Sequence, residues 1–184
     1  LGGDGADAMS GGADADRFVG GAGTDTITAG TAGDTCAPDA VDPVTGACTI
    51  DTTPPTISEI AVPATVAAGS TLTVSWRLVD ASGVADQVGA TPSWMKLGGA
   101  SGWISTWCAF PTVATRVSGT ALDGRYQATC QVPATAVNGT YSVFVGATDV
   151  FGNSGETPTS TDFVITAGSG DASPPVVTDL TISP

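Results

Sequence analysis

Aspartate recurs every nine residues near the start of the chain, at Asp7, Asp16, Asp25 and Asp34. A glycine pair opens each of the first three nine-residue units, and a side chain suited to a protein interior follows each aspartate two positions later. Those interior candidates are Met9, Phe18, Ile27 and Cys36. This is the pattern G-G-x-G-x-D-x-U-x, which predicts that each unit forms a tight turn and a short strand and that successive units stack into a parallel β-roll.

The aspartates also predict what such a roll binds. Each turn would place one carboxylate at a fixed position beside backbone carbonyls, which is the all-oxygen environment that Ca²⁺ prefers. Without a cation, stacked carboxylates repel one another, so we expect folding of this segment to be coupled to calcium binding. A flexible acidic linker is the alternative, but a linker has no reason to keep aspartate at a fixed period.

Residues 1–37 resemble the RTX (repeats-in-toxin, haemolysin-type) calcium-binding repeats. In that family successive turns alternate between the two sides of the roll, so the resemblance implies that Asp7 pairs with Asp25 and Asp16 with Asp34. It also implies that further ligands come from the glycine-rich turns. In this chain those turns contain Gly2, Gly3, Asp4, Gly5, Gly20, Gly21 and Gly23.

Two of the four units depart from the family pattern. Asp14 replaces a glycine in the second unit, and Ala29 and Ala32 replace glycines in the fourth. We expect weaker or distorted sites there. Asp39 and Asp42 follow the repeats, and we interpret them as solvated turn acids rather than as ligands.

Charge and composition exclude several functions. The chain carries a net charge of −13 with only five basic residues, so it lacks the basic face that a nucleic-acid backbone requires. No apolar run is long enough for a membrane-spanning helix. There is no histidine, which removes serine–histidine and cysteine–histidine mechanisms, and we expect neither catalytic residues nor enzyme activity.

Four cysteines occur as two pairs that are close in sequence. Four cysteines allow three connectivities, and proximity favours Cys36–Cys48 together with Cys108–Cys130. Disulfides predict a location outside the cytoplasm, in a secreted or surface-displayed protein. We expect residues 38–53, which follow Cys36 and include Cys48, to form a disulfide-closed cap and a linker.

From Pro54-Pro55 onwards the pattern changes to alternating or β-branched runs separated by turn signals. Residues 54–168 therefore predict an antiparallel β-sandwich. Apolar side chains alternate within the expected strand 71–79, so that Leu72, Val74, Trp76 and Leu78 share one face. The expected strands are 56–62, 71–79, 93–97, 103–108, 112–117, 125–132, 140–148 and 161–166.

The phrases DTTPPTIS (51–58), LVDASGV (78–84) and GATDVFGNSG (146–155) resemble bacterial Ig-like modules of surface proteins and adhesins. The resemblance implies that the loops after Asp80 and Asp149 lie at one end of the sandwich. With Asp51 or Asp171 in the linkers, these residues would form a second calcium site between domains, as in calcium-rigidified adhesins. The interpretation we prefer is that they are ordinary turn residues.

Three tryptophans, Trp94, Trp103 and Trp107, are close in sequence, and Trp103 and Trp107 share parity on one expected strand. If their side chains are exposed, they form a platform for stacking sugars, and the domain is a carbohydrate- or ligand-binding module. If they are buried, they pack in or beside the core, as we expect for Trp76. We favour packing.

The C-terminal residues 169–184 predict a linker and the first strand of another module. The stretch DASPPVVTDLTIS (171–183) repeats the phrase DTTPPTISEIAVP (51–63). We therefore expect this chain to be a slice of a longer modular protein. Pairing of residues 176–183 with a neighbouring sheet would join subunits into an extracellular filament.

Together these features predict an all-β chain, with a short RTX-like parallel β-roll followed by an Ig-like antiparallel β-sandwich. The expected function is that of a calcium-dependent structural or adhesive segment of a secreted or surface-displayed bacterial protein. Its expected partners are neighbouring repeats of the same chain or identical subunits, and cell-surface glycans in the sugar-binding alternative.

Overall fold

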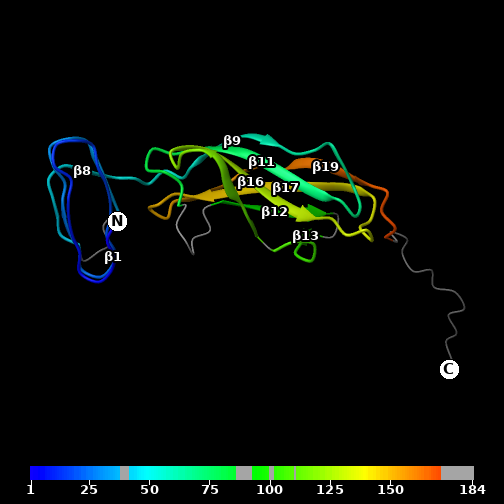
Figure 1. Ribbon diagram of the computed structural model, residues 1–184, viewed down its shortest axis with the longest axis horizontal. Coiled ribbons are helices and arrows are strands. Elements are labelled where there is room, and N and C mark those ends of the chain that lie inside the picture. The colour runs from blue at the N-terminus through cyan, green and yellow to red at the C-terminus, as the bar shows by residue number, and fades with distance from the viewer. Residues whose placement is uncertain (38–41, 86–92, 100–101, 110, 171–184) are drawn as a thin grey trace, which may run out of the picture.

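The structure is a computed structural model that describes residues 1–37, 42–85, 93–99, 102–109 and 111–170. Every regular element in these residues is a β-strand, which confirms the all-β prediction. A small roll at the N-terminal end and a longer sandwich follow one another along the long axis of the molecule (Figure 1). The predicted strand 176–183 lies outside the described residues.

The roll consists of short parallel strands in stacked columns. Its elements are β1 (Gly3–Asp4), β2 (Ala8–Ser10), β3 (Arg17–Val19), β4 (Gly21–Ala22), β5 (Thr26–Thr28), β6 (Asp34–Ala37), β7 (Val44–Thr45) and β8 (Cys48–Ile50). One column is β2-β5-β7, the second is β3-β6-β8, and β1 pairs with β4. Met9 is in register with Ile27, and Phe18 with Cys36. Strands two repeats apart are therefore neighbours, as the alternation of turns predicts.

The predicted interior residues fill the space between the two columns. Phe18, Ile27 and Cys36 are buried, and Ala29 joins them. Met9 and Cys48 pack against this cluster and are partly buried. The cluster is small, so burial of apolar surface alone gives the roll little stability.

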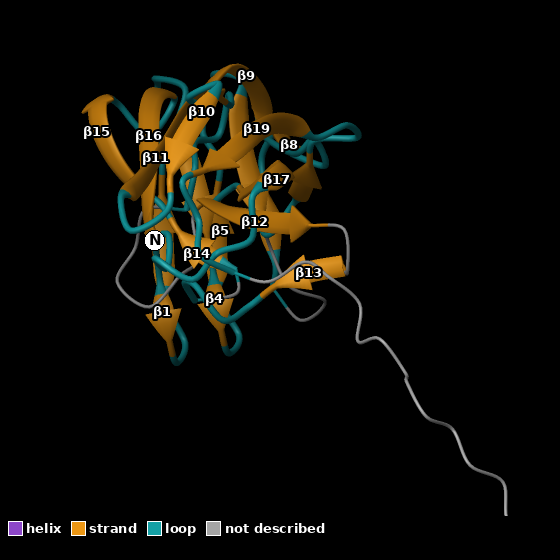
Figure 2. Ribbon diagram, turned by 90° about the vertical axis from the view of Figure 1, so that its right-hand side faces the viewer, coloured by secondary structure: helices purple, strands orange, loops and turns teal. Residues whose placement is uncertain are grey.

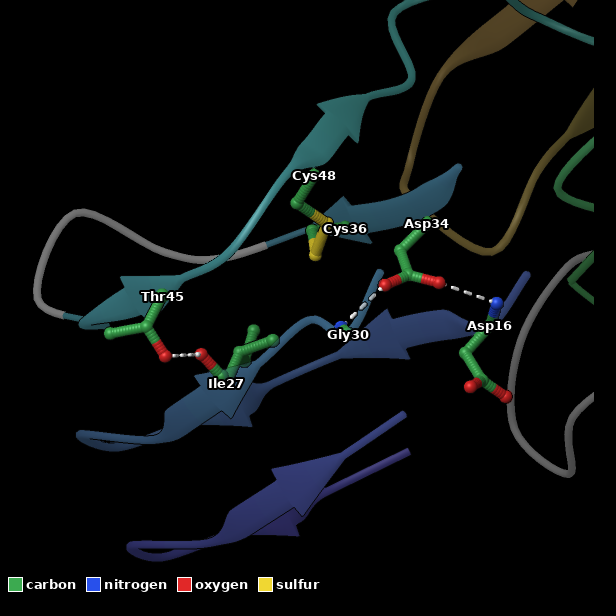
Figure 3. The surroundings of a disulfide bond; sticks show 7 residues. All are labelled: Asp16, Ile27, Gly30, Asp34, Cys36, Thr45 and Cys48. Atoms are coloured by element: carbon green, nitrogen blue, oxygen red, sulfur yellow. Dashed lines mark hydrogen bonds between the residues drawn. A yellow bond between two sulfur atoms is a disulfide. The ribbon is translucent and has the colours of Figure 1, made fainter. Parts of the chain in front are cut away.

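Parallel pairing continues beyond the fourth repeat. Val44 of β7 pairs with Ile27, and Ile50 of β8 pairs with Cys36. The Thr45 hydroxyl donates a hydrogen bond to the Ile27 carbonyl at 3.4 Å, and the predicted Cys36–Cys48 disulfide joins β6 to β8 (Figure 3). The disulfide-closed segment thus adds the last strand to each column.

The sandwich has two sheets, seen edge-on in Figure 2. One is antiparallel, in the order β15 (Thr115–Gly119), β16 (Asp123–Gln131), β11 (Thr71–Val79) and β9 (Thr56–Ala61). The other has the order β10 (Thr65–Ala67), β19 (Thr161–Thr166), β17 (Gly139–Thr148), β12 (Ser93–Gly99) and β13 (Gly102–Ile104). In that sheet β14 (Thr112–Val113) also pairs with β12, and β18 (Ser154–Glu156) with β17.

The sandwich core follows the predicted alternation. The four apolar side chains of β11 that share one face are fully buried against residues of β17 such as Val143 and Val145. Trp76 is among them, and its indole N–H donates to the Ser93 hydroxyl at 3.0 Å, which in turn donates to the Gly146 carbonyl. The largest core side chain therefore leaves no buried donor unsatisfied.

Three features of the sandwich differ from the prediction. The expected strand 112–117 is divided at Ala114 into β14, which pairs with β12, and β15, which pairs with β16 of the other sheet. The expected strand 103–108 ends at Ile104, so Trp103 and Trp107 do not lie on one strand. The cause is the second predicted disulfide, Cys108–Cys130, which holds the chain after Ile104 against β16 of the opposite sheet. The short strands β10 and β18 were not predicted, because three residues carry too little alternation to be recognised.

The stacking geometry predicts unequal effects of alanine at two equivalent glycines. Gly3 and Gly21 occupy the same repeat position and have φ values of 123° and 104°. A Cβ atom at Gly3 would meet nothing within 4 Å, whereas one at Gly21 would collide with the Gly3 carbonyl oxygen of the neighbouring turn. Gly3→Ala should cost about 1–3 kcal/mol of roll stability through backbone strain alone, and Gly21→Ala should cost more.

Thermal unfolding of both variants in calcium-containing buffer, followed by far-ultraviolet circular dichroism, measures this difference. Gly3→Ala is the matched control for strain. Equal losses in the two variants would show that close approach between turns does not limit the residue at position 21.

Candidate metal centres

The repeated aspartates form two ladders along the roll. The Asp7 amide donates to a carboxylate oxygen of Asp25, and the Asp16 amide donates to one of Asp34, both at 2.8 Å. The Asp25 amide donates in the same way to Asp42 at 2.8 Å. The structure thus brings together the pairs that the sequence predicted and extends one of them by a further acid.

Asp42 was interpreted as a solvated turn acid, and that interpretation is wrong. Its backbone precedes β7, which pairs with β5 directly beside Asp25, and its carboxylate accepts the Asp25 amide. The sequence signal is hidden because Asp42 follows Asp25 by 17 residues instead of 18. Asp39, its neighbour in the same segment, lies outside the described residues.

The second carboxylate oxygens of the first three repeat aspartates are buried and have no hydrogen-bond partner among the described residues. These atoms are Oδ2 of Asp7, Asp16 and Asp25. Asp25 is fully buried. A buried carboxylate oxygen without a partner costs considerable free energy unless a cation compensates it.

Glycine makes room for these oxygens. A Cβ atom added at Gly2 would lie 2.8 Å from Oδ2 of Asp7, and one at Gly20 would lie 2.6 Å from Oδ2 of Asp25. The fourth turn differs, since Ala29 stands at the equivalent position and Oδ2 of Asp34 accepts the Gly30 amide at 2.8 Å (Figure 3). The departure from the pattern in the fourth unit therefore changes the local hydrogen bonding.

These residues fit calcium. The ladders offer hard anionic oxygens beside backbone carbonyls, the ligand type that Ca²⁺ takes. The first 50 residues contain one basic residue, Arg17, and its guanidinium donates to the Ser82 carbonyl of the sandwich. No basic side chain within the roll is thus available to neutralise the ladders. The predicted Asp4 and the substituted Asp14 are exposed in their turns.

A second acidic cluster lies where the roll meets the sandwich. Asp51, Asp80 and Asp149 each place one carboxylate oxygen within 4.8 Å of the others, and Asp80 and Asp149 are buried. The Val150 amide donates to the Gly83 carbonyl and so joins the two loops, and the Asp149 amide donates to the Asn153 carbonyl within its own loop. Three like charges at this separation repel by about 1–4 kcal/mol per pair.

Some hydrogen bonds of this second cluster are those of an ordinary turn, and others link its carboxylates to one another through Ser82. Asp80 Oδ1 accepts the Ser82 and Gly83 amides, as in the turn that we preferred from the sequence. The Ser82 hydroxyl lies 2.6 Å from Asp80 and 2.5 Å from Asp51, yet it has one proton for two carboxylates. Hydrogen bonds to its carboxylate, chiefly from the Ser82 hydroxyl and then from Thr53, hold the pKa of Asp51 below its usual range.

The three tryptophans do not form one cluster. Trp94 lies against Gly146, and its indole nitrogen is 3.4 Å from Glu156. Trp103 is 52% exposed, and Trp107 packs on Tyr141 with ring centroids 5.0 Å apart. Burial raises the pKa of Tyr141. The predicted platform is therefore reduced to Trp103 and its surroundings.

Among the described residues, no helix is long and apolar enough to cross a membrane. Among curated proteins, none matches this chain. The solved structures that are similar to it in part include the following three. The GspB Siglec domain is 20% identical with a TM-score of 0.41, over 62% of this chain and 57% of that one.

The sialic acid binding region of a Streptococcus sanguinis SK1 adhesin is 21% identical with a TM-score of 0.38, over 62% of this chain and 30% of the adhesin. Dimeric latent PorU from Porphyromonas gingivalis is 15% identical with a TM-score of 0.42, over 73% of this chain and 12% of PorU. Residues 1–36 match the RTX calcium-binding nonapeptide repeat in four copies. This segment, which forms most of the N-terminal roll, is therefore similar to the RTX calcium-binding repeats.

Proposed function

We propose that this chain is a calcium-dependent structural segment of a secreted or surface-displayed protein, in which calcium binding drives the folding of the roll and makes it rigid. The observation that carries the proposal is the set of buried, unpartnered carboxylate oxygens on Asp7, Asp16 and Asp25. Two disulfides favour an oxidising, extracellular setting. Calcium is scarce inside cells and abundant outside them, so the roll would fold after export.

The two carboxylate oxygens of the roll aspartates have different roles. The Oδ1 atoms of Asp25, Asp34 and Asp42 hold the ladder together by accepting amides of the neighbouring turns. The Oδ2 atoms of Asp7, Asp16 and Asp25 remain for the metal, and glycines such as Gly2 keep the space open. Bound calcium supplies the positive charge that lets these carboxylates stack. The roll's small apolar cluster then closes between the two columns.

We further propose that Asp51, Asp80 and Asp149 form a second calcium site, separate from those of the roll. This cluster joins the linker to two loops of the sandwich, and two of its carboxylates, those of Asp51 and Asp80, share the single hydroxyl proton of Ser82. A cation there would fix the linker to the sandwich. With the bond from Arg17 to Ser82, it would couple the orientation of the roll to that of the sandwich.

The domain division follows from the same features. We propose a roll with its disulfide-closed end over residues 1–53, a sandwich over 54–168 and a linker over 169–184. The filament hypothesis rests on residues 176–183 and stays a prediction from the sequence.

The first prediction concerns the roll sites. Asp25→Asn keeps an oxygen to accept the Asp7 amide but removes a charge from the ladder. It should raise the calcium concentration at half-folding by about tenfold or more, equivalent to about 1.4 kcal/mol. Calcium titration of the full chain by far-ultraviolet circular dichroism measures the midpoint.

Asp14→Asn is the matched control, because it removes the same charge from an exposed turn position. All four tryptophans lie in the sandwich, so tryptophan fluorescence should stay constant while the circular dichroism changes. A roll that is folded without calcium, or equal midpoints in the two variants, would rule the proposal out.

The second prediction concerns the junction. In the full chain, calcium should raise the melting temperature of the sandwich, since a ligand that binds only the folded state stabilises it, by about 3 kcal/mol at a hundredfold excess over Kd. Asp80→Asn should abolish this increment, whereas Asp162→Asn, an exposed acid on β19, should preserve it. Scanning calorimetry with and without chelator measures the increment, and its persistence in Asp80→Asn would exclude the junction site.

A further inference from the structure

The sandwich has a groove on its surface, formed by β13, the residues that follow it, and the loop that leads into β17. One wall is formed by β13 and residues 105–107, and the other by residues 135–141. Its volume is about 600 Å³, within the range of sites for small ligands. A smaller hollow of about 240 Å³ adjoins it over Gly98 and Phe144, and Trp103 lines both.

Among the tryptophans, all of which the structure describes, Trp103 is the most exposed, with 52% of its surface accessible. It is nevertheless fixed in place. Phe144 meets it edge-on at a centroid distance of 5.1 Å, and the Lys96 ammonium lies 5.8 Å from the ring centre. A large, exposed and well-positioned aromatic ring can bind a ligand face without losing side-chain freedom on binding.

The floor of the groove is rigid as well. Trp107 packs on Tyr141 at 5.0 Å, and Tyr141 packs on the core residue Phe163 at 5.8 Å. The Tyr141 hydroxyl donates to the Val137 carbonyl at 2.8 Å, which holds the opposite wall. The Cys108–Cys130 disulfide anchors the wall that contains Trp107. The groove is therefore shaped before a ligand arrives.

The polar groups of the groove are neutral hydrogen-bonding groups. The hydroxyls of Ser105, Thr106 and Thr140 line the groove and form no hydrogen bond with other described residues. Asn138 uses its side-chain carbonyl oxygen to accept the Gly168 amide at 2.7 Å, which leaves its N–H₂ group as a hydrogen-bond donor in the groove. Among the described lining residues none is charged. An aromatic face beside free hydroxyl and amide groups matches the chemistry of a sugar ring, which has apolar C–H faces and hydroxyl edges.

We infer that this groove binds an uncharged saccharide, with one sugar ring stacked on Trp103. The charge of the site argues against an acidic glycan. The chain carries a net charge of −13, and the nearest cation, Lys96, is 2.5 Å from Glu156 in an ion pair. The inference does not rest on calcium binding by the roll or the junction, so the two proposals fail or succeed separately.

The test uses the full chain in calcium-containing buffer and a panel of uncharged hexasaccharides of glucose, mannose, galactose and N-acetylglucosamine. Saturation-transfer NMR and tryptophan fluorescence measure binding, with 3′-sialyllactose as the acidic probe. At least one uncharged hexasaccharide should bind, and Trp103→Ala should weaken it about tenfold or more. Thr140→Val, which removes a hydroxyl and keeps the side-chain shape, should weaken it severalfold.

Trp94→Ala is the matched control, because Trp94 does not line the groove, and it should bind as the unaltered chain does. Near-ultraviolet circular dichroism verifies that each variant is folded. If Trp103→Ala does not fold, Thr140→Val still tests the groove independently. The inference is overturned if no hexasaccharide binds, if 3′-sialyllactose binds more tightly than every uncharged probe, or if both groove variants keep full affinity.

Discussion

The stacking of like-charged carboxylates is the constraint on which the N-terminal roll, and its connection to the sandwich, depends. Each ladder joins the amide of one aspartate to the carboxylate of another, and this places acids such as Asp7, Asp25 and Asp42 in neighbouring turns. The same turns require glycine where backbones meet, as at Gly21. Close stacking and charge repulsion therefore arise from the same contacts, and a cation is the direct way to reconcile them.

The sandwich depends on different forces. Its core contains fully buried residues from both sheets, with Trp76 hydrogen-bonded at its centre, so it has apolar burial sufficient for a domain of its size. The roll has one small cluster around Ile27, and domains of this kind need a metal or a cross-link. This contrast explains why removal of calcium should act first on the roll. The Arg17 contact and the Asp51 cluster join the two parts, so unfolding of the roll would affect the sandwich through them.

Strong periodicity explains how much of this structure could be predicted from the sequence. The resemblance of the nine-residue repeats to the RTX family implied the pairing of Asp7 with Asp25, and alternation over nine residues predicted β11 at its observed bounds. Both disulfides followed from proximity. The ladder position of Asp42 was missed because a spacing of 17 residues breaks the period. Contacts between distant loops, such as that of Arg17 with Ser82, leave no local pattern in the sequence.

Hydrogen exchange of the full chain, measured by mass spectrometry with calcium and with a chelator, tests the calcium-coupled folding of the roll most directly. In chelator, amides of the roll such as those of Asp7, Asp16 and Asp25 should exchange within seconds, while those of β11 and β17 stay protected. With calcium, both parts should be protected. Equal protection of the roll amides in the two conditions would contradict the account, because it would show that the carboxylate ladders are stable without a cation.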